Sequence, residues 1–292
     1  SFTNIAFRTQ INDDVSIAVI QDEPFGAAVD WTDSSGAYSP VEATIKTSAT
    51  TVLMGYDFDN ITVYGGLKNQ SFQAEATTAI AGVSAAYNIT STADSRLGYV
   101  LGAAFERPEI ALKLALTFSS KVSHKVSVSE KLRSSSTAVA SILQADTPSS
   151  INFDFQTGIA ADTLLFGSVR SVKWTQTDLR PNVYVQNHLD GDSLKKFTTD
   201  PITYNVGVAR KFSDKWAGAF TYGTEASEGG TSGPLGPTDG FSKMGAAVSY
   251  SADKADITLA MQKVNNGDTT MQYASMASNT TTVTVVKVAY KF

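Results

Sequence analysis

The sequence predicts an all-β fold, a transmembrane antiparallel up-and-down β-barrel, and three observations carry this prediction. Tight polar turns alternate with long Gly-, Ser- and Thr-rich loops, the segments between them alternate apolar with small or polar residues, and the chain closes on an alternating segment that ends in Phe292. Membrane barrels need short turns at one rim and longer loops at the other. We therefore expect one barrel domain over residues 1–292.

The composition agrees with a barrel and argues against other classes. The 292 residues include no cysteine and carry a formal charge of -5. Mean hydropathy is near zero and no run of about 18 apolar residues occurs, which excludes a helical membrane protein. A barrel wall gives such an average because lipid-facing apolar residues alternate with polar lumen-facing ones. The acidic balance argues against nucleic acid as a partner.

Six tight turns divide the chain. Asp, Asn and Pro suit them because these residues bond local backbone groups or preset φ. The longer segments between the turns are interpreted as loops at the opposite rim. The turns are residues 12–14, 58–60, 107–109, 160–162, 213–215 and 252–254, and the loops are residues 30–40, 73–96, 123–149, 176–200, 226–240 and 264–280.

The segments between turns and loops alternate with period two. In residues 97–106, large apolar side chains alternate with small or polar ones, and residues 110–119, 151–156 and 203–208 repeat the pattern. This period over about ten residues matches a tilted membrane strand. The small or polar face is expected to line a solvated lumen. Which face residues 163–175 present is ambiguous.

The strand count indicates that a strand precedes the chain. About thirteen strands can be placed, whereas single-chain bacterial barrels have even numbers so that the wall closes. We therefore expect a complete barrel of fourteen strands, with one before Ser1. The last segment places Tyr290 and Phe292 where bacterial barrels carry a C-terminal aromatic insertion signal, although any last strand can end in Phe.

Five stretches resemble the FadL family of outer-membrane transporters of long-chain fatty acids and other hydrophobic compounds. They are PEIALKLALTF at 108–118, PSSINFDFQTG at 148–158, DTLLFGSVR at 162–170, KFSDKW at 211–216 and LGPTDGF at 235–241. The resemblance implies a barrel of fourteen strands and a passive channel. It also implies an N-terminal plug, which is not present in this sequence, so the family's gating cannot be assigned to any residue here.

Pro24, Phe25 and Gly26 interrupt the second predicted strand. Proline removes a hydrogen bond from a strand ladder and glycine weakens a strand interior, so we expect an inward kink. The resemblance implies that a kink in this strand opens a lateral hole through which ligand leaves into the bilayer. The alternative is an ordinary β-bulge.

Two loops carry apolar residues that could capture a hydrophobic ligand. Both sets have helical spacing, and the resemblance implies an external apolar groove between two neighbouring loops. The alternative is that these residues pack on each other and cap the barrel. The residues are Ile80, Val83 and Tyr87 in the first loop, and Val139, Ile142 and Leu143 in the second.

A fatty-acid carboxylate would need a cationic partner. By parity Lys113 is the best candidate that faces the lumen, and Arg170 is a second candidate on the ambiguous strand. A cluster at Lys121, Lys125, Lys131 and Arg133 would contact lipopolysaccharide phosphates or be solvated.

The sequence does not predict an enzyme. Its two histidines, His124 and His188, lie in predicted loops, away from any wall Ser or Asp. We therefore expect no catalytic residue, metal or cofactor. The alternatives to a hydrophobe channel are a general porin for polar solutes and a structural, abundant outer-membrane barrel.

The expected location is the bacterial outer membrane. The expected partners are a hydrophobic small molecule such as a fatty acid or hydrocarbon, outer-membrane lipid and lipopolysaccharide, and the barrel-assembly machinery. Transport would need no energy coupling, because the ligand partitions into the bilayer by itself.

Overall fold

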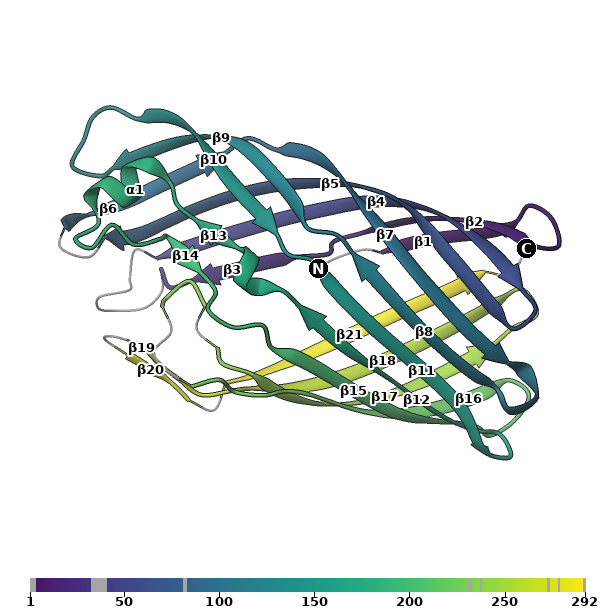
Figure 1. Cartoon of the computed structure of the whole chain (residues 1–292). Helices are drawn as coiled ribbons and strands as arrows, with labels where there is room; N and C mark the ends of the chain where they lie inside the picture. The colour runs from purple at the N-terminus through teal and green to yellow at the C-terminus, as the bar shows by residue number, and fades with distance from the viewer. Residues whose placement is uncertain are drawn as a thin grey trace.

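Seventeen antiparallel strands form one sheet that curls into a barrel (Figure 1). The computed structural model describes residues 4–32, 41–80, 83–229, 233–236, 238–271, 274–277 and 279–290. Four of the seventeen strands, β3, β6, β9 and β10, prolong a neighbouring strand across a short break. The wall therefore has thirteen continuous or broken strands, each of which we call a stave. The expected strand number and the all-β fold are confirmed.

The first seven staves are built from long strands, several of them broken. They comprise β1 (Ile5–Gln10), β2 (Val15–Asp22) with β3 (Gly26–Asp30), β4 (Glu42–Phe58), β5 (Ile61–Ile80), β6 (Val83–Ser91) with β7 (Asp94–Arg107), β8 (Leu112–Ser119) with β9 (Val122–Leu132), and β10 (Val139–Thr147) with β11 (Ser150–Ala160).

The remaining staves are unbroken, and short elements lie in the connections between them. The staves are β12 (Thr163–Val172), β15 (Ile202–Lys211), β16 (Trp216–Glu225), β17 (Phe241–Ser251), β18 (Ala255–Asn266) and β21 (Thr280–Tyr290). The short elements are η1 (Pro108–Ile110), η2 (Trp174–Gln176), β13 (Asp178–Leu179), α1 (Asn182–Asn187), β14 (Lys195–Lys196), β19 (Thr269–Met271) and β20 (Ala274–Met276). None of the described helices has the length and apolar character to cross a membrane.

All six predicted turns connect neighbouring staves at one rim, at the right in Figure 1. Their residues act as expected: the side chain of Asn12 accepts hydrogen bonds from the amides of Asp14 and Val15 at 3.0 and 2.8 Å. Asp59 and Asp162 take positive φ values of 49° and 55°, which Asp tolerates better than most residues. The turn rim was therefore determined locally.

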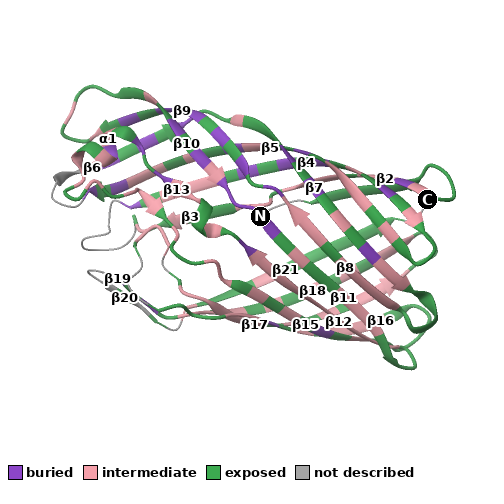
Figure 2. Ribbon diagram, in the orientation of Figure 1, coloured by how far each residue is buried: buried purple, intermediate pink, exposed green. Residues whose placement is uncertain are grey.

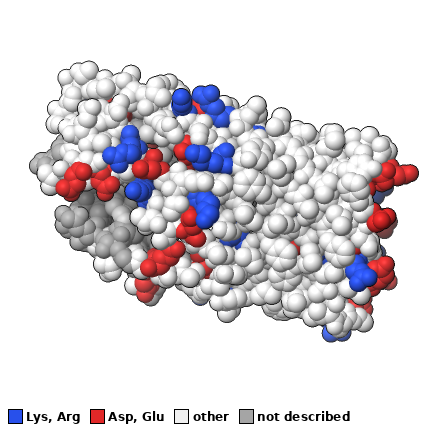
Figure 3. Space-filling model, in the orientation of Figure 1, with Lys and Arg blue, Asp and Glu red and all other residues white. Residues whose placement is uncertain are grey.

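The alternation of side chains also holds. Leu97 and Leu101 are 68% and 54% exposed on the outer face, whereas Val100 and Ala104 on the same strand are buried inside. Figure 3 shows a broad band of the wall with almost no charge, between a charged rim at the right and a charged zone at the left. An uncharged band of this kind is what a barrel presents to lipid.

Residues 73–96 and 123–149, expected to be loops with helical faces, instead prolong the wall as strands. β5 continues through Ile80 and pairs with β6, while β9 pairs with both β6 and β10. We call this part, formed by residues 73–91 and 122–147, the extension. Residues 123–131 alternate Ser or Lys outside with His, Val or Glu inside, so their period is two. The helical spacing was a coincidence of three residues in each segment.

The interior of the extension holds the main apolar core of the described residues. Figure 2 shows the buried residues concentrated around β5, β6, β9 and β10. The segment between β12 and β15, residues 173–201, folds back against this inner face. Core residues are Phe72, Ile80, Tyr87, Ile89, Val126, Val128, Leu143 and Ala145 from the wall, with Leu179 and Tyr184 from residues 173–201.

The described wall has two edges. β1 pairs only with β2, and β21 pairs only with β18, among the residues that the structure describes. A further strand before Ser1 stays an expectation. Tyr290 ends β21, where it pairs with Ala255 and is 60% exposed, while Phe292 lies outside the described residues.

Candidate ligand route

The second stave breaks at the predicted position. Asp22 is the last residue of β2 in register with β4, opposite Ala49, and Gly26 resumes the pairing opposite Lys46. Three residues, 23–25, therefore face only two on β4, which is the count of a β-bulge. Pro24 has no amide hydrogen to offer the ladder. The pairing is interrupted at the predicted position with the count of the alternative, a β-bulge, and the inward kink and its use as a lateral exit remain proposals.

A side chain replaces the lost backbone bonds at this break. The amide of Phe25 donates to the hydroxyl of Thr47 at 3.0 Å, and that hydroxyl donates in turn to the carbonyl of Phe25. Gly26 has no positive φ, and a Cβ there would meet only the carbonyl oxygen of Ile45, at 3.7 Å. The described hydrogen bonds at the break are those between Phe25 and Thr47, and the expected weakening of the strand by Gly26 stays a prediction.

Aromatic rings link the break to the opposite wall. The ring of Phe25 lies edge-on to Trp174 with centroids 5.5 Å apart, and Trp174 contacts Phe197 at 4.9 Å. The ammonium group of Lys195 lies 4.7 Å from the centre of the Phe197 ring. Trp174 follows β12, which lies six staves from β2 along the sheet. The contact between Phe25 and Trp174 therefore crosses the interior of the barrel.

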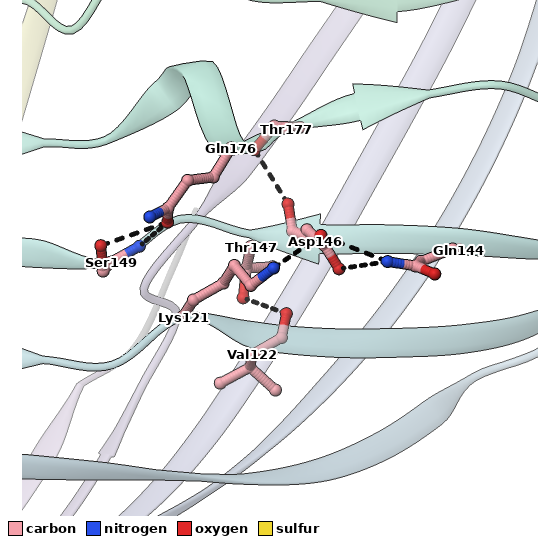
Figure 4. Close-up of polar contacts among 8 residues, drawn as sticks. All are labelled: Lys121, Val122, Gln144, Asp146, Thr147, Ser149, Gln176 and Thr177. Atoms are coloured by element: carbon pink, nitrogen blue, oxygen red, sulfur yellow. Dashed lines mark hydrogen bonds and ion pairs between the residues drawn. The ribbon is translucent and has the colours of Figure 1, made fainter.

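Hydrogen bonds hold the backbone around Trp174 in place. Figure 4 shows the side-chain oxygen of Gln176 accepting from the amide and hydroxyl of Ser149, at 3.0 and 3.2 Å. The hydroxyl of Thr177 donates to the carbonyl of Asp146 at 2.8 Å, and Lys121 forms an ion pair with the Asp146 carboxylate at 3.0 Å. These contacts fasten η2 to the breaks between β8 and β9 and between β10 and β11.

An apolar pocket lies beside the break, between the inner face of the wall around β3 to β6 and residues 173–201. Its free volume is about 60 Å³. Ala27 and Val29 of β3 form one side, and Leu194 and Lys195 form part of the other. The remaining apolar lining comes from Ala43, Ile45, Ala74, Ala76, Ile89, Val128, Leu143, Leu179 and Leu235.

The predicted capture residues divide between the interior and the outer surface. Leu143 lines the pocket, and Ile80 and Tyr87 are buried in the adjoining core. Ile142 is 62% exposed on the outer face, whereas Val139, which is 48% exposed, has the inward parity of its partner Glu130. Val83 begins β6, but its side chain lies outside what the structure describes.

Glu130 was missed by the sequence analysis although it fastens residues 173–201 to the extension. Its carboxylate accepts hydrogen bonds from the hydroxyls of Tyr87 and Ser141 at 2.8 and 2.6 Å, and from the amide of Val183 at 2.8 Å. The side chain is fully buried. The available signal was its position on the inner face of the alternating segment at residues 123–131.

The two predicted cations face the lumen but lie below the pocket. Lys113 forms an ion pair with Glu106 near the turn rim. Arg170 pairs in register with Asn152 and Thr203 on the inner face, which settles the ambiguous facing of β12. It lies within electrostatic range of Asp22 and Asp154, and the buried Lys68 is within range of Asp22. We call Asp22, Lys68, Asp154 and Arg170 the charged cluster.

Lys195 is the cation nearest the pocket, and sequence reasoning missed it. It is half-buried, and burial lowers the pKa of its ammonium group. No described carboxylate forms an ion pair with it. The sequence could not single out Lys195, because the neighbouring Lys196 is the same residue type and only the structure shows that Lys196 is exposed.

The described residues contain no group of three His, Cys, Asp or Glu side chains placed to hold a metal ion. The imidazole of His124 is fully buried, with its Nδ1 3.1 Å from the carbonyl oxygen of Asp94 and its ring stacked on Phe72. His188 ends α1.

No family model matches the sequence, and no curated protein matches it. Solved structures do. A Pseudomonas aeruginosa FadL homologue has a TM-score of 0.76 at 13% identity, over 98% of this chain and 75% of that chain. The CymD monoaromatic hydrocarbon channel has a TM-score of 0.67 at 8% identity, over 100% of this chain and 82% of its own. The Ralstonia pickettii toluene transporter TbuX has a TM-score of 0.66 at 12% identity, over 99% of this chain and 80% of the TbuX chain.

Identities this low establish the fold. The chain has the fold of these channel and transporter structures. The FadL-type barrel expected from the sequence is confirmed at that level.

Proposed function

We propose that the chain is a passive channel of the bacterial outer membrane for long-chain fatty acids or related hydrophobic molecules. Ligand is held in the apolar pocket and leaves sideways through the wall at Pro24, Phe25 and Gly26. The observation that carries this proposal is the position of the pocket, which touches β3 directly above the break. The solved structures of a toluene transporter and a monoaromatic hydrocarbon channel support the ligand class.

The charged cluster favours sideways exit over passage down the lumen. An alkyl chain moving down from the pocket would meet the charged side chains of Asp22, Lys68 and Arg170, and their contact with it would cost free energy. Moving outward, the same chain would enter lipid, where each methylene gains about 0.8 kcal/mol relative to water. The ligand's own partitioning therefore drives transport, and no cofactor is needed.

Capture is assigned to residues on both sides of the extension. Ile142, exposed on the outer face, provides a first apolar contact, and Leu143, on the inner face, belongs to the pocket. Val139 has the inward parity of its partner Glu130, and its exposed side chain is assigned to the open end of that inner face. Ile80 and Tyr87 support the pocket from the core. We expect Leu143→Asp to abolish retention of labelled oleate and Ile142→Asp to reduce only its rate of capture.

Lys195 is better placed than Lys113 or Arg170 to hold a carboxylate. It borders the pocket and has no described carboxylate partner, whereas Lys113 is paired with Glu106 and Arg170 interacts with Asp22 and Asp154. A fatty acid could place its head group at Lys195 and its chain among the pocket's leucines. A neutral hydrocarbon would use the leucines alone.

The membrane partners follow from the outer surface. The uncharged band fits outer-membrane lipid, and Lys125 and Lys131, on the outer face of β9, fit lipopolysaccharide phosphates. Tyr290, which ends β21, and Phe292 are proposed as the signal for the barrel-assembly machinery.

Uptake of labelled oleate by cells carrying the full-length gene tests lateral exit. Gly26→Leu adds an apolar side chain at the first paired residue after the break, where the backbone has room for it. Ala28→Leu is the matched control, since it lies on the same face within the paired part of β3. We expect Gly26→Leu to reduce uptake at least tenfold while Ala28→Leu retains it. Equal uptake by both variants would exclude this exit.

The charged cluster favours a second candidate, a general porin for polar solutes. Charged side chains at a narrow part of a lumen set ion selectivity in porins. A porin would give steady ion conductance in planar bilayers, and Arg170→Glu would reverse the preferred ion sign. A hydrophobe channel would conduct little in either form.

A further inference from the structure

The aromatic contacts across the interior suggest how pocket and exit communicate. We propose that Phe25, Trp174 and Phe197 form a latch, in which occupation of the pocket displaces Phe197, frees Trp174 and releases Phe25 from its closed position. Trp174 is then a positioning residue for the exit. This inference rests on the proposed function, because it assumes that ligand leaves at the break.

The latch and the pocket share the same two segments. On one side, Phe25 immediately precedes β3, whose Ala27 and Val29 line the pocket. On the other side, Phe197 follows directly after β14, and Leu194 and Lys195 line the pocket. A molecule between these segments therefore bears on both ends of the latch.

The pocket must widen to admit a ligand. Its free volume of about 60 Å³ is well below the ~150 Å³ of an engineered cavity that binds benzene. The wall side is held by long ladders, such as that between β4 and β5. The opposite side is held by the two-residue pairing of Asp178 with Lys196 and Leu179 with Lys195. The segment at Leu194–Phe197 is therefore the part that gives way.

Trp174 is held differently from its two aromatic partners. Its backbone belongs to η2, which Gln176 and Thr177 fasten to the wall (Figure 4). Displacement of residues 194–197 thus separates Phe197 from a ring whose backbone stays in place. The indole then loses one neighbour and can turn away from the other, Phe25.

Phe25 is ready to move once the indole leaves. Its backbone is bonded to the hydroxyl of Thr47 and not to a neighbouring strand's backbone, so its ring can turn without breaking the ladder. Trp174 is its described aromatic contact. Release of this one contact therefore changes the inner lining of the break.

Fluorescence of Trp174 tests the first half of the latch. The chain has three tryptophans, so the Trp31→Phe, Trp216→Phe variant of the full-length protein reports Trp174 alone. Oleate added to this variant should shift the Trp174 emission with the same midpoint as the binding of labelled oleate. A variant that retains only Trp216, which lies at the turn rim, should not respond. Saturated binding with unchanged Trp174 emission would overturn the latch.

Uptake by a double-mutant cycle tests the second half. Phe25→Leu and Trp174→Leu should each raise the initial rate of oleate uptake two- to tenfold, and the double variant should match the single ones. Multiplying effects, or rates equal to wild type, would overturn the latch. Folding is checked by circular dichroism and by heat-dependent gel mobility. If wild type neither binds nor takes up oleate or toluene, the proposed function fails and the latch fails with it; binding without the Trp174 response overturns the latch alone.

Discussion

The carboxylate of Glu130, on β9, accepts a hydrogen bond from the phenol of Tyr87, on β6, at 2.8 Å, and both side chains are fully buried. The same carboxylate accepts from the amide of Val183, at the start of α1. A buried charge is stable only when such donors surround it. This contact therefore joins two wall strands and the segment that carries the pocket's inner side.

Removing the carboxylate should release residues 173–201 from the extension. Glu130→Ala leaves the phenol, a hydroxyl and an amide without their acceptor, which we expect to cost about 3 kcal/mol of local stability. Tryptic cleavage after Lys196, which is exposed and followed by Phe197, should then accelerate roughly 100-fold, since each 1.4 kcal/mol is a factor of ten. Glu109→Ala, in an exposed turn at the other rim, is the control and should leave the rate unchanged. Equal cleavage in both variants would contradict this role.

Tyr87 should resist ionisation in the folded protein. Burial, the hydrogen bond to Glu130 and the charge of Glu130 all raise the pKa of its phenol far above the ordinary value. Its contribution to stability is therefore complete below pH 10 and decreases above pH 10, where the unfolded chain ionises. Ultraviolet titration of wild type and Tyr87→Phe should differ by one tyrosinate, and only at the pH where the extension unfolds. If Tyr87→Phe showed one tyrosinate fewer than wild type already near pH 10, Tyr87 would ionise in the folded protein and the prediction would be refuted.

Acid should weaken the extension through His124. Burial lowers the pKa of its imidazole, and the nearby Asp94 only partly opposes the shift. Above pH 6.5 the imidazole is neutral in both folded and unfolded chains, so its environment carries no penalty. Below pH 6.5 the unfolded chain takes up the proton first, and stability falls. The protection of β9 amides against hydrogen exchange, taken relative to the intrinsic exchange rate at each pH, should fall between pH 7.5 and 5.5 in wild type. His124→Phe should remove this dependence, whereas His188→Gln should retain it.

Lys195 should separate acids from neutral hydrocarbons. A hydrogen bond to a charged group contributes about 1.5–3 kcal/mol, so Lys195→Met should weaken oleate binding roughly 10- to 100-fold and leave toluene binding unchanged. Lys196→Met, at the exposed neighbouring position, is the matched control. Because burial lowers the pKa of Lys195, oleate binding should weaken with rising pH earlier than an ordinary lysine would allow. Equal loss for both ligands would assign Lys195 to packing alone.

The wall could be read from the sequence because its rules are local. Side chains of a strand alternate between two faces, so Leu97 and Leu101 had to share the face opposite Val100 whatever the partner strands were. Turn residues such as Asn12 bond their own backbone, so the turn rim needed no tertiary contact either. The position of the break at Pro24 followed from the missing amide of proline.

The extension could not be read as easily, because its pattern was judged on too few residues. Ile80, Val83 and Tyr87 have helical spacing, but Ile80 and Tyr87 both point inward from paired strands. Strand pairing beyond the barrel depends on three breaks that bring β6, β9 and β10 together, and no single segment contains that information.

The sequence by itself determined a barrel with a turn rim, an apolar outer face and an interrupted second stave, since each depends on period two or on the chemistry of one residue. Only the tertiary structure decided the interior. Trp174 meets Phe25 because residues 173–201 fold inward and cross the barrel, and Lys195 borders the pocket while Lys196 does not because a two-residue pairing fixes which of them turns inside. Contacts between distant segments leave no periodic trace in the chain, so the ligand route becomes visible only in the folded protein.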